Sequence, residues 1–271
     1  LYLFTIFSAS GFASLAQRYS KINKKGIRKP HKIFWLISMA ILIFIMGFRE
    51  YFVGVDGANY IRMYNEINST TLVKYYSLRT TEPGYYILNK LIYLIFNDYQ
   101  WVFICSAFIT IACFYKAISY EIENISLNLA IFIFTTTQYF YYFGIMRMGI
   151  ATAIVSVAFR YLLKNNRKAY IFMVLLATSF HYSALFALSG LFIKRNPETE
   201  RFKNTTLLKI IILIPIAFFA VRYLIFPFIT ASRYQRYINS TSIISLGFIT
   251  SLPTLLLFTI FYKKMTKMNK N

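Results

Sequence analysis

The run WVFICSAFITIACFYKAIS, residues 101–119, contains one charged side chain, that of Lys116. As a helix it would rise about 28 Å, close to the ~30 Å hydrocarbon core of a lipid bilayer. Its flanks are polar, with Asn97 and Asp98 before it and residues 121–124 after it. This length and composition predict a membrane-spanning helix.

Comparable apolar runs recur along the whole chain. Apolar residues make up 58% of the sequence and charged residues 14%, whereas ordinary soluble domains carry about 25% charged residues. The run LLKIIILIPIAFFAV, residues 207–221, does not alternate between apolar and polar residues as strands of a membrane barrel do. The sequence therefore predicts an all-α, polytopic helical integral membrane protein with about seven to nine spans.

The expected spans and shorter apolar helices are Leu1–Ala16, Ile33–Phe48, Tyr85–Phe96, Trp101–Ser119, Ser126–Phe143, Gly149–Leu163, 169–193, Leu207–Phe228 and Leu246–Tyr262. No internal repeat, low-complexity tract or linker separates these runs. Residues 1–271 are accordingly expected to form a single integral membrane domain.

The net charge of +21 is concentrated at the ends of the apolar runs. Of the 30 basic residues, 20 lie in four clusters, at residues 18–32, 160–168, 194–209 and 263–270. Basic loops beside apolar spans follow the positive-inside rule, so we place them in the cytoplasm and expect no nucleic acid partner.

The chain offers little for metal or redox chemistry. It has two His, and Cys105 and Cys113 are eight residues apart on one apolar run. That spacing is about 12 Å along a helix, too far for a disulfide. No metal-ligand set, Gly-rich phosphate loop or nucleophile elbow occurs. We expect no metal and no cofactor.

Two topologies treat the short apolar stretches differently. In the first, all four basic clusters are cytoplasmic, Tyr85–Phe96 inserts only partly, and 169–193 turns back at its central break. The twelve residues of Tyr85–Phe96 would cover about 18 Å as a helix, too little for the ~30 Å core. In the second, both stretches span, and only residues 164–168, KNNRK, lie on the opposite side. We favour the first topology, with its two short re-entrant or broken helices.

The longest polar stretch runs from Arg49 to Tyr85 and begins REYFVGVDGANYIRMYNEI. It holds four of the nine acids and as many basic residues, so its net charge is zero. In the favoured topology it is an external polar loop, residues 49–84. Arg147, His181 and the outer part of the Arg222 helix lie on the same face. Ionisable groups beside membrane spans indicate a functional site.

Glu82 is the first candidate for a catalytic base. It ends the polar stretch in Glu82-Pro83-Gly84-Tyr85 against an apolar run, an environment that suits a carboxylate to proton transfer. An acid followed by proline is also simply a good helix start.

Asp56 and His181 are the other candidate acid–base groups. Asp56 and Tyr60 are four residues apart and would share a face if the segment were helical. VDGAN, residues 55–59, is equally compatible with a turn. His181 lies in the break of 169–193, where a lone His is more often a hydrogen-bonded packing residue.

Three arginines could bind an anion. Arg49 follows a predicted span, where a snorkelling arginine is common. Arg147 is expected at a helix start, where the helix dipole disfavours a cation, so a purely structural role is less expected. Arg222 lies within the predicted span Leu207–Phe228 and either snorkels outward or lines a cavity.

Arg49 is followed by four motifs in a fixed order: VGVDGANY at 53–60, EPGYYILNKLI at 82–92, GIMRMGIATAI at 144–154 and LLATSFHYSAL at 175–185. In order and spacing they resemble the EpsG family of bacterial exopolysaccharide and capsule membrane proteins, within the wider Wzy-type polysaccharide polymerase group. The family usually has VGTDT and IRQG where this chain has VGVDG and MRMG. The side chains replaced by Val55, Gly57 and Met148 are therefore not expected to be essential.

The resemblance implies a membrane glycosyltransferase at the external face of the bacterial cytoplasmic membrane. It would polymerise polyprenyl-diphosphate-linked oligosaccharide units into exopolysaccharide, capsule or O-antigen, with chain-length regulator and flippase proteins as possible partners. Arg49, Arg147 and Arg222 would bind the diphosphate, since guanidinium groups bind phosphate bidentately. Glu82, Asp56 or His181 would act as the base, and the rings of Tyr60 and Tyr85 would contact the substrate.

Two other functions stay open. Intramembrane charges and broken helices are also typical of transporters, here one that flips lipid-linked glycans, but the chain lacks paired halves of similar hydropathy. A membrane acyltransferase that modifies the glycan would require a better-supported His than His181.

Overall fold

The computed structural model describes residues 1–192, apart from 25, 27, 79 and 80. Leu1–Lys194 belong to one compact unit. The predicted spans Leu207–Phe228 and Leu246–Tyr262, and with them Arg222, lie outside the described residues.

The described part is helical apart from one short hairpin. Its α-helices are α1 (Tyr2–Arg18), α2 (Lys32–Gly47), α3 (Gly57–Ser69), α4 (Leu72–Leu78), α5 (Pro83–Phe96), α6 (Gln100–Ser119), α7 (Leu127–Phe134), α8 (Met146–Leu163) and α9 (Arg167–Thr178). A π-helical turn, η1 (Thr135–Tyr139), and a 3₁₀ turn, η2 (Tyr141–Phe143), follow α7, and a longer 3₁₀ segment, η3 (Tyr182–Phe192), follows α9. The strands β1 (Lys21–Ile22) and β2 (Arg28–Lys29) pair antiparallel, with Lys21 opposite Lys29.

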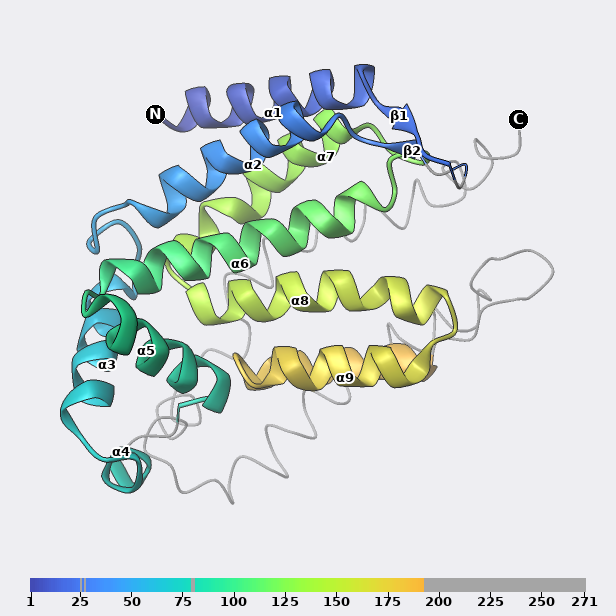
Figure 1. The fold of residues 1–271 in the computed structure, drawn as a ribbon. Coiled ribbons are helices and arrows are strands. Elements are labelled where there is room, and N and C mark those ends of the chain that lie inside the picture. Colours follow the sequence, from blue (N-terminus) through green and yellow to red (C-terminus); the bar gives the residue numbers. More distant parts are fainter. Residues whose placement is uncertain (25, 27, 79–80, 193–271) are drawn as a thin grey trace, which may run out of the picture. The chain divides into compact units, whose positions relative to one another are not determined.

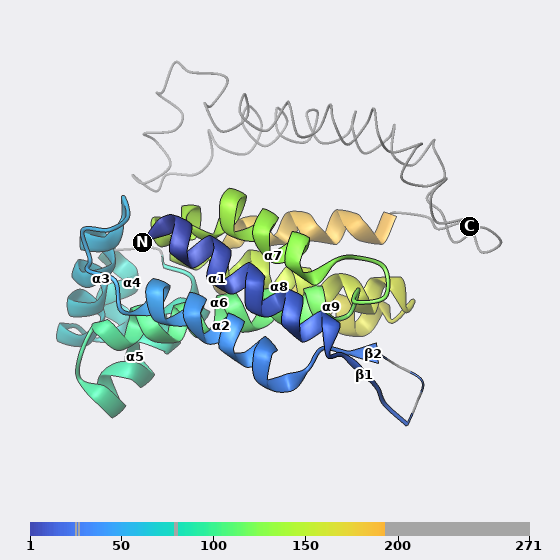
Figure 2. The ribbon, with the colours of Figure 1, turned by 90° about the horizontal axis from the view of Figure 1, so that it is seen from above.

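Six of the helices in the described part run along one another as a bundle. In Figure 1, α1 lies beside α2 and α7, followed in turn by α6, α8 and α9. Figure 2 shows α1 between α2 and α7. Small buried residues such as Ala9 and Ala13 let α1 approach its neighbours closely. Ser38 on α2 donates to the Ala9 carbonyl at 2.6 Å and shares a 2.7 Å hydrogen bond with the Tyr115 hydroxyl on α6.

One end of this bundle, which we call the basic end, is formed by residues 18–32, 120–126 and 160–167. The Arg28 backbone N–H donates to the Glu123 carboxylate at 3.2 Å, and the guanidinium carbon of Arg160 lies 3.8 Å from the centre of the Tyr120 ring. Two of the predicted cytoplasmic clusters, 18–32 and 160–168, thus lie at the same end, as the favoured topology requires.

The opposite end carries the sequence motifs, and we call it the motif end: residues 48–57, 82–85, 98–101, 141–147 and 179–183. The Gln100 side chain donates to the Gly47 carbonyl at 2.7 Å, joining α6 to α2. The Gly84 N–H donates to the Ser179 carbonyl at 2.8 Å, joining the start of α5 to the end of α9. Figure 1 shows α3, α4 and α5 gathered at this end.

The two short apolar stretches form one short helix and one broken segment. α5 has 14 residues and packs against α3 and the start of α6 at the motif end. The stretch 169–193 breaks after Thr178, and the Tyr170 hydroxyl on α9 donates to the Ala187 carbonyl on η3 at 2.5 Å. That hydrogen bond shows η3 turning back along α9.

The described helices have the character of a helical membrane protein. α6, with 20 residues, and α8, with 18, are long and apolar enough to cross a bilayer, and the apolar α2 is shorter at 16 residues. Large apolar side chains also point away from the bundle, among them Phe4, Phe7, Phe44 and Phe172. Such exposure is expected where lipid rather than water surrounds the helices.

The structure differs from the predicted single helix over Ser126–Phe143. α7 ends at Phe134, and the chain continues through the π-helical turn η1 and the 3₁₀ turn η2. The hydroxyls of Thr135, Thr136 and Thr137 each donate to the carbonyl four residues earlier, at 2.7–2.8 Å. Three successive threonines that bond to these carbonyls compete with the helical ladder, a known cause of bends and irregular turns.

The predicted polar loop at 49–84 is also largely helical, since it contains α3 and α4. Tyr60, Met63, Tyr64 and Ile67 are buried along one face of α3. Their spacing is helical and gives the segment an apolar face to pack on its neighbours despite its overall polarity.

Candidate functional site

The segment VGVDG folds onto the turn before α8. Gly54 has a φ of +126°, and a Cβ there would lie 2.6 Å from the Phe143 carbonyl oxygen. A Cβ at Gly57 would lie 1.7 Å from the Tyr51 carbonyl oxygen. A side chain at either position would force the neighbouring backbone to shift, and at Gly54 the positive φ also favours glycine. The motif therefore holds the entry to α3 against residues 143–144.

Arg49 is buried at this junction, 7% exposed. Its guanidinium donates to the carbonyls of Met46, Val53 (3.2 Å) and Phe143 (2.8 Å). It also lies 4.8 Å and 4.9 Å from the ring centres of Phe103 and Phe143. Burial lowers the pKa of Arg49 to about 10, so it stays charged at neutral pH. These contacts join the end of α2 to the turn before α8.

Glu82 and Arg147 form an ion pair that is mostly shielded from solvent, with side chains that are 4% and 13% exposed. Glu82 is 3% exposed and directly precedes α5, but its side chain caps no helix N–H and instead accepts a hydrogen bond from Arg147 Nη1. Arg147 lies in the first turn of α8, as its position in the sequence predicts. The carboxylate compensates for the unfavourable helix dipole at this position.

Two tyrosines pack around this pair. The guanidinium carbon of Arg147 lies 5.8 Å from the centre of the Tyr85 ring, and the Tyr60 and Tyr85 ring centres are 5.9 Å apart. Burial raises the pKa of Tyr60, and the charge of Arg147 opposes that shift. Among the described residues, Arg147 Nε and the Tyr85 hydroxyl are buried without a hydrogen-bond partner. Unpaired buried donors beside a fixed charge are suited to binding an anion.

Asp56 and His181 lie around this centre. Asp56 immediately precedes α3, and its backbone carbonyl accepts from the Tyr60 N–H at 3.0 Å. The segment from Asp56 to Tyr60 is therefore helical rather than an isolated turn. The Asp56 carboxylate lies close enough to contribute to the raised pKa of Tyr60. His181 lies in the turn between α9 and η3, where its Nδ1 is 2.8 Å from the Ser183 hydroxyl.

The structure thus brings together Glu82, Arg147, Tyr60 and Tyr85, places Asp56 and Arg49 beside them, and places His181 two residues beyond Ser179 in the adjoining turn. Arg222 lies outside the described residues. Sequence reasoning did not identify Ser179, which fixes the start of α5. Its position directly before the predicted break was the available signal.

Gly84 fixes the approach of α5 to α9. A Cβ at this position would lie 2.3 Å from the Ser179 hydroxyl and 2.9 Å from its carbonyl oxygen. We expect Gly84→Ala to destabilise the protein by about 2 kcal/mol, the scale of overpacking a close contact. Thermal unfolding of the detergent-purified protein would measure this loss.

The matched control for that substitution is Gly11→Ala on α1. A Cβ at Gly11 meets nothing within 4 Å, and alanine is the better helix former by about 1 kcal/mol. The control should therefore be neutral or slightly stabilising. Equal stability of the two variants would contradict the close packing of Gly84 on Ser179.

Comparison with known proteins identifies the family of this chain. Searches of curated proteins and of solved structures found no match. The family model described as the EpsG family matches residues 32–271. That range covers most of the chain and every motif assembled at the motif end, so this protein belongs to the EpsG family.

Proposed function

We propose that this EpsG-family protein is a Wzy-type glycosyltransferase of the bacterial cytoplasmic membrane. It would polymerise polyprenyl-diphosphate-linked oligosaccharide units into an exopolysaccharide, capsule or O-antigen. The observation that carries this proposal is the buried Glu82–Arg147 pair with its unpaired neighbouring donors at the motif end. A buried ion pair contributes little to stability, so its presence here favours a chemical role.

In the proposed step, a hydroxyl oxygen of one lipid-linked unit attacks the anomeric carbon of the growing chain on a second lipid. The bond between that carbon and the diphosphate oxygen breaks, and the lipid diphosphate leaves with the electron pair. The hydroxyl proton passes to a carboxylate. The products are a chain longer by one unit, still on a lipid, and a free lipid diphosphate.

Arg147 is the residue we assign to the leaving diphosphate. Its Nε–H lacks a partner among the described residues, and a guanidinium presents the donor fork that phosphate oxygens accept. The Tyr85 ring lies 5.8 Å from the Arg147 guanidinium carbon, and we assign its hydroxyl as a second donor. Negative charge that develops on the leaving group would thus meet donors already in place.

Glu82 is the carboxylate we assign as proton acceptor. In the described structure Arg147 holds its side chain in place. A diphosphate that binds Arg147 would compete for the guanidinium and leave the carboxylate available to the acceptor hydroxyl. Asp56 and His181 stay in the proposal as alternative proton acceptors, and the ring of Tyr60 as a substrate contact.

Arg49 is better explained as a structural residue than as a diphosphate ligand. Its guanidinium is already bonded to three backbone carbonyls and stacked on two rings. A phosphate could reach it only by displacing those contacts.

The topology that we propose places the motif end outside the cell. The basic end holds two of the four basic clusters and would face the cytoplasm. The spans would number about seven to nine, counting the runs beyond residue 192, and residues 1–271 would form one membrane domain. A flippase that supplies the units and a chain-length regulator are the partners this function requires.

The test is glycan length in a host strain from which this protein has been deleted. We expect the deletion to abolish long chains while single repeat units still reach the outer face, and the wild-type protein to restore long chains. Accumulation of lipid-linked units on the inner face would instead indicate the flippase. Long chains of normal length that lack an acyl substituent would indicate the acyltransferase.

A further inference from the structure

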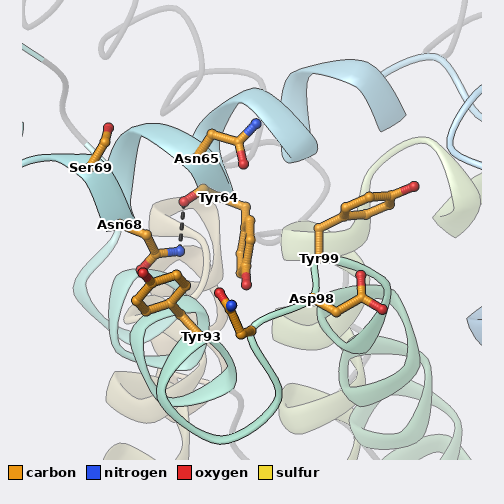
Figure 3. Close-up of a pocket in the computed structure, with 8 residues that line it drawn as sticks. Tyr64, Asn65, Asn68, Ser69, Tyr93, Asp98 and Tyr99 are labelled. Atoms are coloured by element: carbon orange, nitrogen blue, oxygen red, sulfur yellow. Dashed lines mark hydrogen bonds between the residues drawn. The ribbon is translucent and has the colours of Figure 1, made fainter.

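An open pocket of about 470 Å³, lined by residues that carry polar groups, lies at the C-terminal ends of α3 and α5. Figure 3 shows the ring of Tyr64 between Tyr93 on one side and Asp98 and Tyr99 on the other. The residues that line it include Tyr64, Asn65, Asn68, Tyr93, Asp98 and Tyr99. None of these was a candidate from the sequence, although Tyr60, Tyr64 and Asn68 recur at four-residue spacing along α3.

Two polar atoms in this pocket lack partners. The Tyr64 hydroxyl and Asn68 Oδ1 are buried with no hydrogen-bond partner among the described residues, and Tyr64 is only 6% exposed. Asn68 Nδ2 donates to the Tyr64 carbonyl at 2.7 Å, which fixes the amide so that Oδ1 is the atom left over. An unpaired buried polar atom costs about 1–3 kcal/mol, so both atoms indicate a polar ligand.

The residues that line the pocket also indicate that the ligand is uncharged. It contains phenols, amides, one hydroxyl and the Asp98 carboxylate, and its described residues include no Lys or Arg. Burial and the nearby Asp98 charge both raise the pKa of Tyr64, so its phenol stays neutral. An anion such as a phosphate would meet the Asp98 carboxylate in this lining, and the Lys90 ammonium lies outside it, 5.9 Å from the centre of the Tyr93 ring. A neutral ligand rich in hydroxyls would find both donors and acceptors.

The pocket adjoins the Glu82–Arg147 pair through packed aromatic rings. Tyr60 and Tyr64 lie on successive turns of α3, about 6 Å apart along the helix axis. Tyr60 packs on Tyr85 beside the ion pair, and Tyr64 packs on Tyr93 with ring centres 6.2 Å apart. A ligand that extends along α3 and α5 could therefore contact both places.

We propose that this pocket binds an uncharged sugar residue of the glycan, with the Tyr64 hydroxyl and Asn68 Oδ1 as hydrogen-bond partners and the Tyr93 ring as an apolar wall. The proposal rests on the function proposed above and deepens it. The diphosphate binds Arg147, while a sugar away from the reacting bond occupies the pocket and fixes the register of the chain. Aromatic rings that carry a polar group suit this role because they present both an apolar face and a hydrogen-bonding edge.

The test measures binding of lipid-free oligosaccharides to the full chain in lipid nanodiscs. The probes are fragments of one to three repeat units, released by mild acid from the host cell's own polysaccharide. Binding is followed by saturation-transfer NMR of the sugar protons. It is also followed by the fluorescence of Trp101, which lies two residues after the lining residue Tyr99, in a Trp35→Phe background.

We expect saturable binding that Tyr64→Phe and Asn68→Ala each weaken by about tenfold, the equivalent of one good hydrogen bond. Tyr64→Phe should not lower thermal stability, because its hydroxyl has no partner among the described residues. Tyr141→Phe, which removes an exposed phenol at the motif end, is the matched control and should bind like the wild type. Absence of binding to the wild type, or unchanged binding by both pocket variants, would overturn the proposal.

The same samples separate this proposal from the polymerase. If Arg147→Lys abolishes long chains in cells but Tyr64→Phe and Asn68→Ala both bind oligosaccharides like the wild type, the polymerase stands and the pocket proposal fails. If Tyr64→Phe loses oligosaccharide binding while Arg147→Lys leaves chain length normal, the sugar pocket stands and the proposed polymerase site fails.

Discussion

Arg147→Lys is expected to abolish long glycan chains while the protein stays folded in the membrane. Lysine keeps a positive charge beside Glu82, so no buried carboxylate is left without a partner, a loss that would cost about 3–5 kcal/mol. It lacks the guanidinium fork that binds phosphate oxygens bidentately. Because removal of one preorganised donor typically lowers a rate by about 100- to 1000-fold, only single units or very short chains should remain.

The measurement is glycan length by gel electrophoresis in the deletion strain complemented with each variant, after membrane levels have been matched. Arg62→Lys is the control, because Arg62 lies exposed on α3 and its guanidinium donates to the Asn59 side chain at 2.9 Å, one turn away on the same helix. That control should give normal chains. Normal chain length with Arg147→Lys at wild-type levels would remove Arg147 from the catalytic site.

Arg49→Lys is expected to lower the stability of the protein by about 3 kcal/mol or more. The single ammonium of lysine cannot reach the carbonyls of Met46, Val53 and Phe143 together, and each buried carbonyl that loses its partner costs about 1–3 kcal/mol. The contacts with the Phe103 and Phe143 rings would also weaken. The loss should appear as a lower midpoint of thermal unfolding in detergent and as lower membrane levels.

The matched control is Arg18→Lys at the basic end, where Arg18 is exposed in the last turn of α1 and its removal should leave the midpoint unchanged. This comparison separates two roles for Arg49. If Arg49 binds the diphosphate, the Arg49→Lys protein should lose activity while its stability stays unchanged. If Arg49 has the structural role described here, the variant should lose stability first. If the Arg49→Lys protein unfolds at the same temperature as the wild type, that result would favour a diphosphate-binding role for Arg49.

Much of the fold could be predicted because its signals are local. Apolar runs of the right length indicated helices at α2, α5 and α6 close to their observed bounds, and the break before His181 was visible as a polar interruption of an apolar run. Basic residues at the ends of those runs indicated which loops share a side. Each of these signals comes from residues that are close together in the sequence, so it can be read without knowing the tertiary structure.

Local signals failed where side chains compete with backbone hydrogen bonds or where polarity hides an apolar face. The three threonines after Phe134 turned an expected straight span into η1 and η2. The segment after Asp56 was expected to be a loop because it is polar, yet its buried residues Tyr60, Met63, Tyr64 and Ile67 form a helical face.

The sequence by itself determined the membrane class, the order of the motifs and the candidate residues Glu82 and Arg147. Only the tertiary structure decided that these two side chains pair across 65 residues of sequence. It also decided that the Arg49 guanidinium donates to three backbone carbonyls, and that Tyr64 and Asn68 each place an unpaired buried atom at a pocket. The reason is physical. Composition and periodicity indicate which face of a segment is buried and which is exposed to solvent or lipid. The partner of a buried charge, in contrast, depends on which helix ends pack together.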